Sequence, residues 1–172
     1  MDAAMTEPVI HDWAFSLGKG KRGEIRVAQY LESAGYVAIP CGYVDGGTVS
    51  MTAPDMRVVS HATNPSKYLV GKTLEVKTDS RAHETGNVVI ELLSNACSGR
   101  LGWIYSCEAD ALAYLVEDTG EAIFVETRKM KAAMSVWRGR FVGIENSTFF
   151  GLSMLVPLDS LRSLAFHVAV IP

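Results

Sequence analysis

Three residues in one stretch of the chain, Asp55, Glu75 and Lys77, are of types that together support metal-assisted hydrolysis. The stretch 53–79, APDMRVVSHATNPSKYLVGKTLEVKTD, predicts a β-hairpin that turns at residues 64–66, Asn-Pro-Ser. Antiparallel pairing about position 65 places Asp55 opposite Glu75, and the Cβ atoms of such cross-strand partners are about 4.5–5.5 Å apart. Lys77 is two residues beyond Glu75 and therefore points to the same face of the hairpin.

The two carboxylates favour a divalent cation between them. Neighbouring carboxylates repel each other, so that the pKa of one is raised, and a bound cation removes this cost. Mg²⁺ prefers carboxylate oxygens and keeps several of its waters. Such a metal lowers the pKa of a bound water and neutralises charge on a phosphoryl oxygen. Lys77 could then orient the water or stabilise a developing oxyanion.

The order of these residues resembles the motif of the PD-(D/E)xK nuclease superfamily, which includes restriction endonucleases, Holliday junction resolvases and RecB-type exonuclease domains. Pro54-Asp55 matches its first part and Glu75-Val76-Lys77 its second. The family's first core helix often carries a glutamate that faces the site, and Glu24 opens a predicted helix of that kind. Small phage-type members add a T/S-G-N-x-x-x-E strand and a later Ala-Asp, and the matching residues here are Thr85, Gly86, Asn87, Glu91, Ala109 and Asp110. The resemblance covers roughly residues 18–126.

The resemblance implies a restriction-endonuclease-like core, in which helices flank a central mixed β-sheet, and the hydrolysis of DNA phosphodiester bonds. It implies that Asp55, Glu75 and the carbonyl of Val76 bind Mg²⁺, for which Mn²⁺ could substitute. Lys77 would assist the attacking water. The enzyme would be an endonuclease, and it could be structure-selective or resolve Holliday junctions.

Three further acidic residues receive roles only through the resemblance. Glu24 would act on the metal directly or through a water. Glu91 and Asp110 would be accessory residues, which either orient neighbouring groups or hold the sheet together.

The stretch 18–24, GKGKRGE, matches the pattern G-x-G-x-x-G, and Asp45 lies about 20 residues further on. A dinucleotide-binding loop must follow a buried strand, and the polar residues before position 18 do not form one. A P-loop is excluded because position 15 is Phe where that motif needs Gly. We therefore expect a flexible, glycine-containing approach to a helix whose first turn carries Glu24. The cations expected to contact DNA phosphates, with help from the helix N-terminus, are Lys19, Lys21 and Arg22.

Hydrophobic periodicity predicts a single domain over residues 1–172 of the α+β or α/β class, with a mixed sheet. Helices are predicted at 24–34, at 127–137 with Thr127 as the N-cap, and at 157–164. Strands are predicted at 36–39, on both arms of the hairpin in 53–79, and at 87–93, 121–125, 150–156 and 165–171. The apolar segment 143–158 could belong to the core or could bury an interface between two copies of the chain.

Composition limits the function classes. The 172 residues carry a net charge of −3 and are 48% hydrophobic, and no apolar run reaches the roughly 20 residues of a membrane span. The N-terminal residues do not have the pattern of a secretory signal, so a cytoplasmic protein is expected, in a bacterial or phage-infected cell. Three cysteines and four scattered histidines show no zinc-ligand spacing. The negative net charge argues against tight, sequence-independent duplex binding, although a second group of cations occurs at Arg128, Lys129, Lys131, Arg138 and Arg140.

A catalytically inactive module with the nuclease fold, which binds DNA or a protein without cleaving, is the main alternative function. The sequence leaves open the preferred DNA structure, endonuclease against exonuclease action and the oligomeric state. It also leaves open whether the biological role is recombination, repair, degradation of host DNA or restriction.

Overall fold

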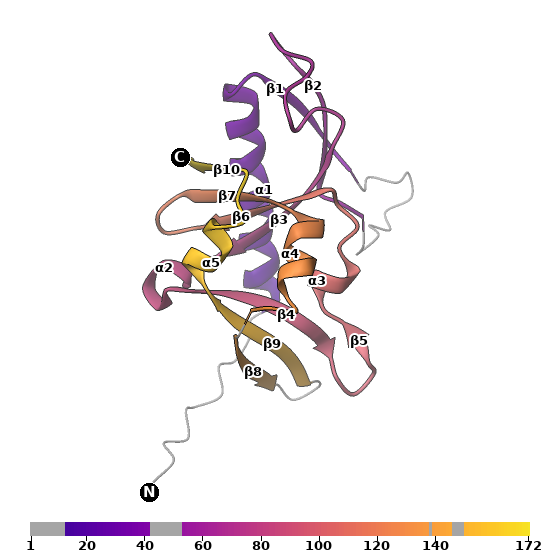
Figure 1. The fold of residues 1–172 in the computed structure, drawn as a ribbon, viewed down its shortest axis with the longest axis vertical. Coiled ribbons are helices and arrows are strands. Elements are labelled where there is room, and N and C mark those ends of the chain that lie inside the picture. The colour runs from indigo at the N-terminus through magenta and orange to yellow at the C-terminus, as the bar shows by residue number, and fades with distance from the viewer. Residues whose placement is uncertain (1–12, 42–52, 138, 146–149) are drawn as a thin grey trace, which may run out of the picture.

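The computed structural model describes residues 13–41, 53–137, 139–145 and 150–172 (Figure 1). Asp45, Arg138 and the first twelve residues, on which parts of the sequence analysis rest, lie outside this description. The chain is of the α+β class, with a mixed, curled sheet at its centre and helices on both sides.

The central sheet has six strands and combines parallel with antiparallel pairing. Strand β3 (Thr73–Asp79) lies parallel to β6 (Ala111–Val116), and the other neighbouring strands are antiparallel. The strand order is β1 (Tyr36–Pro40), β2 (Met56–His61), β3, β6, β7 (Glu121–Glu126) and β10 (His167–Val170). Because parallel neighbours need a long crossover, the chain between β3 and β6 has room for the first two strands of a second sheet, and the other two follow β7.

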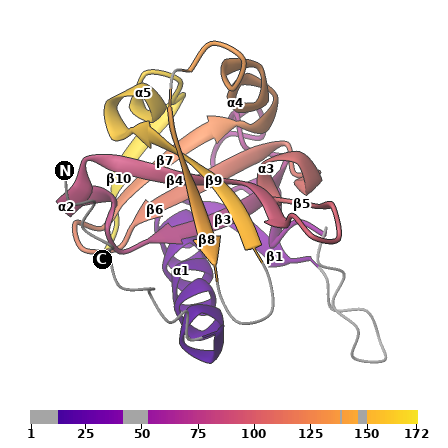
Figure 2. The same cartoon turned by 90° about the horizontal axis from the view of Figure 1, so that it is seen from below.

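The second sheet has four antiparallel strands in the order β5 (Arg100–Leu101), β4 (Asn87–Asn95), β9 (Phe150–Pro157) and β8 (Arg140–Glu145). Two short helices flank its first strands, α2 (Ala82–Thr85) before β4 and α3 (Trp103–Ser106) after β5. The remaining helices are α1 (Trp13–Ser33), α4 (Thr127–Ala133) and α5 (Leu158–Arg162). Helix α1 covers one face of the central sheet, and the second sheet with α4 and α5 covers the other (Figures 1 and 2).

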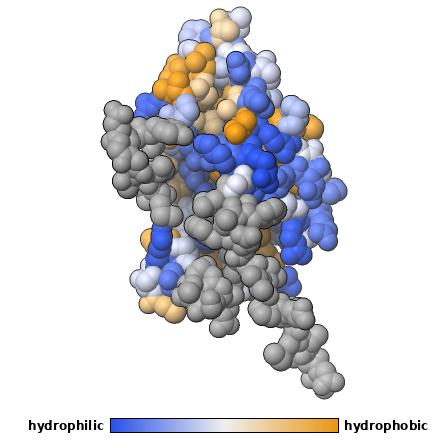
Figure 3. Space-filling model, turned by 180° about the vertical axis from the view of Figure 1, so that it is seen from behind, coloured by the Kyte–Doolittle hydropathy of each residue, from blue (hydrophilic) through white to orange (hydrophobic). Residues whose placement is uncertain are grey.

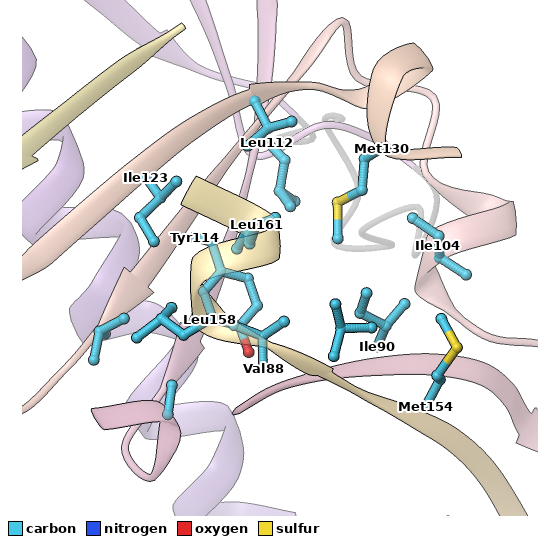
Figure 4. Packing of buried hydrophobic residues seen from close by; sticks show 14 of the residues in the cluster. Val88, Ile90, Ile104, Leu112, Tyr114, Ile123, Met130, Met154, Leu158 and Leu161 are labelled. Atoms are coloured by element: carbon cyan, nitrogen blue, oxygen red, sulfur yellow. The ribbon is translucent and has the colours of Figure 1, made fainter. Parts of the chain in front are cut away.

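Strand β6 is buried along its whole length and supplies both faces of the central sheet with core residues. Leu112, Tyr114 and Val116 pack with residues of β4, β9, α4 and α5 (Figure 4). The intervening residues of the strand, Leu115 among them, pack on the other face against Val27 and other residues of α1 and β2. The period of two in a strand thus divides one sequence between two hydrophobic cores.

Helix α1 differs from the predicted helix at 24–34, because it begins at Trp13 and contains the whole GKGKRGE stretch. The glycines therefore form no flexible approach, and Glu24 does not lie in the first helical turn. Gly23 is buried, and a Cβ atom at this position would lie 1.9 Å from Oγ1 of Thr78 on β3. A glycine at this position lets the helix lie directly on the strand.

The register predicted for the 53–79 hairpin is confirmed by the pairs Met56 with Leu74 and Arg57 with Thr73. The strands at 36–39, 87–93, 121–125, 150–156 and 165–171 are also present, with bounds that differ by a few residues. The pairing of β2 with β3 is shorter than predicted, since residues 62–72 form turns.

Three other details of the secondary-structure prediction were wrong. Thr127 is not the N-cap of α4, because Glu126 holds that position and Thr127 is the first helical residue. Pro157 holds the N-cap position of α5, so the first helical residue is Leu158 and not Pro157. Strand β8 was not predicted at all. Of the segment 143–158, Met154 and Val156 are buried in the core, as one of the two expectations had it.

The described surface is mixed in character. Seen from behind, it is hydrophilic across the middle and has a hydrophobic area toward the upper end (Figure 3). Large apolar side chains are exposed at both edges of the central sheet, Val37 and Ile39 on β1 and Val168 and Val170 on β10. No helix in the described part of the chain combines the length and the apolar character needed to cross a membrane.

Candidate active site

Asp55 lies immediately before β2 and next to the middle of β3. Its Oδ2 atom accepts a hydrogen bond of 2.7 Å from the backbone N–H of Val76. The β2–β3 ladder stops at the pair of Met56 with Leu74, so Asp55 takes the position at which the next cross-strand partner would face Glu75. From Glu75 onward, β3 has no β2 residue paired to it on this side, and Asp55 lies at the start of this unpaired edge.

Glu75 and Lys77 project from β3 on the side away from α1. Their neighbours Leu74 and Val76 are buried against the core that α1 covers, so the alternation of the strand sends Glu75 and Lys77 to the opposite face. Lys77 Nζ donates to Glu75 Oε1 at 2.5 Å, and both side chains are largely buried. The ion pair fixes the position of both groups beside Asp55.

Glu24 reaches the same region from the other side, on the middle of helix α1. Its Oε2 atom accepts a bond of 2.8 Å from Lys21, one helical turn earlier. Glu24 and Asp55 line one small cavity of about 110 Å³, together with Ile25 of the helix and Met56 of β2. Helix α1 thus brings Glu24 to the site from its central part, where its position depends on the packing of Gly23 against β3.

The electrostatics of Asp55 reflect this gathering of acidic groups. Burial, followed by the negative charge of Glu75, raises the pKa of Asp55 from its ordinary value of 3.8 to about 7. The Val76 N–H lowers the pKa, the Glu24 charge raises it, and the Lys77 charge lowers it. Asp55 therefore lies near carboxylates whose charge the one lysine does not fully offset, and a cation at this place would stabilise its ionised form.

The donor atoms at this place fit a hard divalent cation in type, although few of them come from the protein. Within the residues that the structure describes, no group of three or more His, Cys, Asp or Glu side chains is arranged to hold a metal ion. Asp55 and Glu75 supply carboxylate oxygens. Val76 directs its N–H to Asp55, and the N–H and C=O of one strand residue point to the same edge. Mg²⁺ suits a site of this kind, because it commonly binds one or two carboxylates and keeps several waters.

Trp103 is a member of this site that the sequence analysis missed. Lys77 Nζ lies 5.7 Å from the centre of the Trp103 ring, within the range of a cation–π contact. The backbone N–H of Trp103 donates a long hydrogen bond of 3.3 Å to Oε1 of Glu91 on β4. No local pattern could have indicated Trp103, because the second sheet brings α3 over β3.

Glu91 and Asp110 do not join the carboxylates of the site. Glu91 touches it only through Trp103. Asp110 Oδ2 accepts bonds from the backbone N–H and the hydroxyl of Thr73, at 2.8 and 2.9 Å, and the former is the main reason why its pKa is lowered. Asp110 thereby fixes the start of β6 against the start of β3, which is one of the two roles expected for it.

The Thr-Gly-Asn stretch that precedes β4 forms a turn. Gly86 has a left-handed φ of +66°, and the Thr85 hydroxyl binds backbone atoms of Arg81 and Asn87. Ala109 is buried beside Asp110. These residues have a structural role, and within the described part of the chain they form no hydrogen bond with Asp55 or Glu75.

The predicted DNA-contacting cations lie on α1 and have protein partners. Lys19 Nζ bonds to Ser80 at 2.6 Å and lies 3.6 Å from Glu117, which Arg22 also approaches at 3.8 Å. Lys21 pairs with Glu24. The helix begins five residues before Gly18, so its N-terminus cannot assist phosphate binding at these side chains, and that part of the prediction was wrong.

Comparison with known proteins adds no identification: no family model, no curated protein and no solved structure matches this chain.

Proposed function

We propose that this chain is a metal-dependent deoxyribonuclease that hydrolyses phosphodiester bonds at the site around Asp55. The single observation that carries the proposal is the gathering of Asp55, Glu75 and Glu24 with Lys77 at the unpaired edge of β3, where burial and the neighbouring acids also raise the pKa of the Asp55 carboxyl. A cluster of acids whose repulsion is only partly relieved is typical of functional sites, because a bound cation or a proton relieves it.

Asp55, Glu75 and the carbonyl of Val76 would hold Mg²⁺ or Mn²⁺. When bound, such a metal supplies a water of lowered pKa and neutralises charge on the phosphoryl group. Asp55 is kept in place for this by the Val76 N–H, and Glu75 by Lys77. Holding the donors before the substrate arrives reduces the reorganisation that the reaction needs.

Lys77 would orient the attacking water and stabilise negative charge on the phosphoryl oxygens. Its ammonium contacts the Glu75 carboxylate and the Trp103 ring. It keeps its positive charge in both contacts and can therefore still interact with a phosphate. Glu24 would act from the α1 side through a water, since its described contact is with Lys21.

The finer description of the fold is also part of the proposal. A helix on one face of a mixed sheet, a hairpin that carries the acidic residues and a parallel neighbour for the second hairpin strand support a restriction-endonuclease-like core. The substrate would be DNA. The endonuclease mode, and any selectivity for branched DNA, follow only from the resemblance in sequence.

A binding module with an inactive site is the second candidate. It is favoured by the absence, among the described residues, of any group of three metal-binding side chains, and by the engagement of Glu75 with Lys77.

A cleavage assay distinguishes the two candidates. The purified chain would be incubated with branched, single-stranded and duplex DNA, in Mg²⁺, in Mn²⁺ and in EDTA. We expect metal-dependent cleavage that falls at least about 100-fold in Asp55→Asn, Glu75→Gln and Lys77→Met. Glu32→Gln, an exposed change on the same helix as Glu24, is the matched control and should cleave normally. Absence of cleavage of every substrate by the wild type would leave the binding module as the better description.

A further inference from the structure

A cleft of about 940 Å³ lies near the candidate active site, and none of Asp55, Glu75 and Lys77 lines it. Its wall includes Tyr105 of α3, the segment from Cys107 to Asp110 that leads into β6, and Lys131 of α4. The volume is at the upper end of the range of pockets that hold small molecules. A cleft of this size holds one or two nucleotides more readily than a length of duplex.

Cys107 is the residue of the cleft wall that connects the cleft to the active site electrostatically. The Cys107 carbonyl binds Lys131 on the cleft side. Its buried thiol has a pKa that is raised mainly by burial, and the charges of Glu75 and Lys77 also act on it. Glu75 and Lys77 lie on the same face of the central sheet as the cleft, opposite α1, since β6 continues from the cleft wall and its Leu112, in register with Glu75, packs on that face. A DNA strand bound at the active site would therefore pass close to the cleft.

Lys131 gives the cleft a positive charge that no described acid neutralises. Its Nζ atom donates to the carbonyl oxygens of Cys107 at 2.7 Å and Tyr105 at 3.5 Å, and it forms no ion pair with the residues that the structure describes. The wall contains three acids, of which Asp110 is engaged by Thr73 and Glu126 by Lys129 at 3.3 Å, while Glu108 is exposed to solvent and forms no ion pair with Lys131. A cation held by neutral carbonyls is suited to bind a phosphate.

Tyr105 offers an aromatic surface at the same cleft. Half of its side chain is exposed, and its ring contacts no other aromatic ring or cation among the described residues. The second tyrosine of the wall differs, because the Tyr68 ring packs 4.4 Å from Phe166 and carries Lys72 at 4.4 Å. Tyr105 is thus the ring onto which a base could stack.

From these features we propose that the cleft is a subsite for an unpaired nucleotide, whose base stacks on Tyr105 and whose phosphate binds Lys131. The inference rests on the proposed nuclease function and names its substrate: DNA with a single-stranded nucleotide next to the bond that is cut. A base inside a duplex is stacked on its neighbours and cannot cover Tyr105, whereas a base in a flap, gap or single strand can.

The first test measures binding without chemistry. A fluorescein-labelled oligo-dT of twelve nucleotides is titrated with the full chain in EDTA, and its anisotropy is followed at several salt concentrations. We expect Tyr105→Ala to weaken binding at least about fivefold, while Tyr105→Phe stays within about twofold of the wild type, because stacking needs the ring and not the hydroxyl. Lys131→Gln should lower the slope of log K against log salt by about 0.7.

Lys129→Gln is the matched control, since Lys129 lies on the same helix as Lys131 but is not itself part of the cleft wall and is paired with Glu126. The proposal is overturned if the wild type does not bind the oligonucleotide, if Tyr105→Ala binds like the wild type, or if the two lysine variants behave alike. Melting temperatures of all variants verify that they are folded.

The second test separates failure of the subsite from failure of the nuclease. Cleavage of a flapped DNA is compared with cleavage of a continuous duplex of the same sequence. Loss of selectivity for the flap in Tyr105→Ala supports the subsite, and equal cleavage of both substrates by the wild type overturns it while the nuclease stands. If no DNA is cut but oligo-dT binding still depends on Tyr105, the subsite stands and the nuclease fails.

Discussion

At the scale of single residues, Asp55 is the carboxyl on which burial and neighbouring charge act together. This carboxyl lies at the edge of β3, just beyond the last residue pair with β2. Its surroundings destabilise the charged form. The backbone N–H of Val76 stabilises that charged form, while burial and the neighbouring acids oppose it more strongly. The result is an acid that takes up a proton or a cation close to neutral pH.

In the metal-free protein, we expect the contribution of Asp55 to stability to fall as the pH rises from about 4 to about 7. The folded chain holds the Asp55 proton up to a pKa of about 7, whereas the unfolded chain releases it near the ordinary value of 3.8, so the folded state binds more protons in this window. Asp55→Asn keeps an oxygen for Val76 and has no proton to lose. It should raise the free energy of unfolding by about 1–3 kcal/mol at pH 8 and change it little at pH 4.

Urea unfolding in EDTA between pH 4 and pH 8 checks this. Asp118→Asn, a change at an exposed turn residue, should follow the wild-type curve. Parallel stability curves for the wild type and Asp55→Asn would contradict the assignment of this pH dependence to Asp55.

The sequence could indicate Asp55, Glu75 and Lys77 because a hairpin is a local structure whose register follows from alternation and turn position. It could not indicate Trp103, which reaches Lys77 only after the chain has built α2, β4 and β5. Asp110 shows the opposite case. An accessory role at the active site was expected for it, but its carboxylate accepts hydrogen bonds from Thr73 and holds two strands together.

At the scale of elements, the contact between α1 and β3 determines how Glu24 approaches the site. The glycines at 18, 20 and 23 predicted an interruption of the helix, because glycine weakens a helix interior. The structure has a continuous helix there, since burial of Val27 and Leu31 against the sheet outweighs that penalty. Propensity is local information, and the sheet on which this helix packs comes from later parts of the chain.

The glycines of α1 should respond oppositely to alanine. Gly23→Ala would place its Cβ 1.9 Å from Thr78 Oγ1, so helix and strand must separate, and we expect a loss of about 1–3 kcal/mol. Gly20→Ala meets nothing within 4 Å and should stabilise the protein by about 0.5–1 kcal/mol through helix propensity. Chemical denaturation of both variants gives the comparison.

Thr78→Ala provides the control for this prediction. It removes the atom that Gly23→Ala would meet, so the double variant should lose less than the sum of the single losses. Equal effects of Gly20→Ala and Gly23→Ala would show that the close approach of α1 to β3 does not matter for stability.

At the scale of the whole molecule, the two hydrophobic cores share the strands β6 and β7. Alternate residues of each strand point into opposite cores, so neither core can lose its packing while the other keeps these strands in place. The mixed class of the sheet was predictable from the order of apolar segments. The division into two sheets and the parallel pairing of β3 with β6 were not, because both depend on contacts between distant segments.

Leu112→Ala and Leu115→Ala, which lie in different cores, should each lower the free energy of unfolding by about 2–5 kcal/mol. Both variants should still unfold in one transition, because the cores share a strand. Urea unfolding followed by far-UV circular dichroism and by tryptophan fluorescence measures this in a Trp13→Phe background, as the remaining Trp103 and Trp137 pack against the same one of the two cores. Different midpoints for the two signals would mean that the cores unfold separately.

The pairing of β4 with β9 has a consequence for the newly made chain. Val88 pairs with Val156, so the partner of β4 is synthesised 68 residues later. At about 5–20 residues per second, the edge of β4 that pairs with β9 waits roughly 3 to 14 s on the ribosome for its partner. During that interval the unfinished chain has an unpaired strand edge that other chains can pair with, so we expect chaperones to raise the yield of folded protein at that stage.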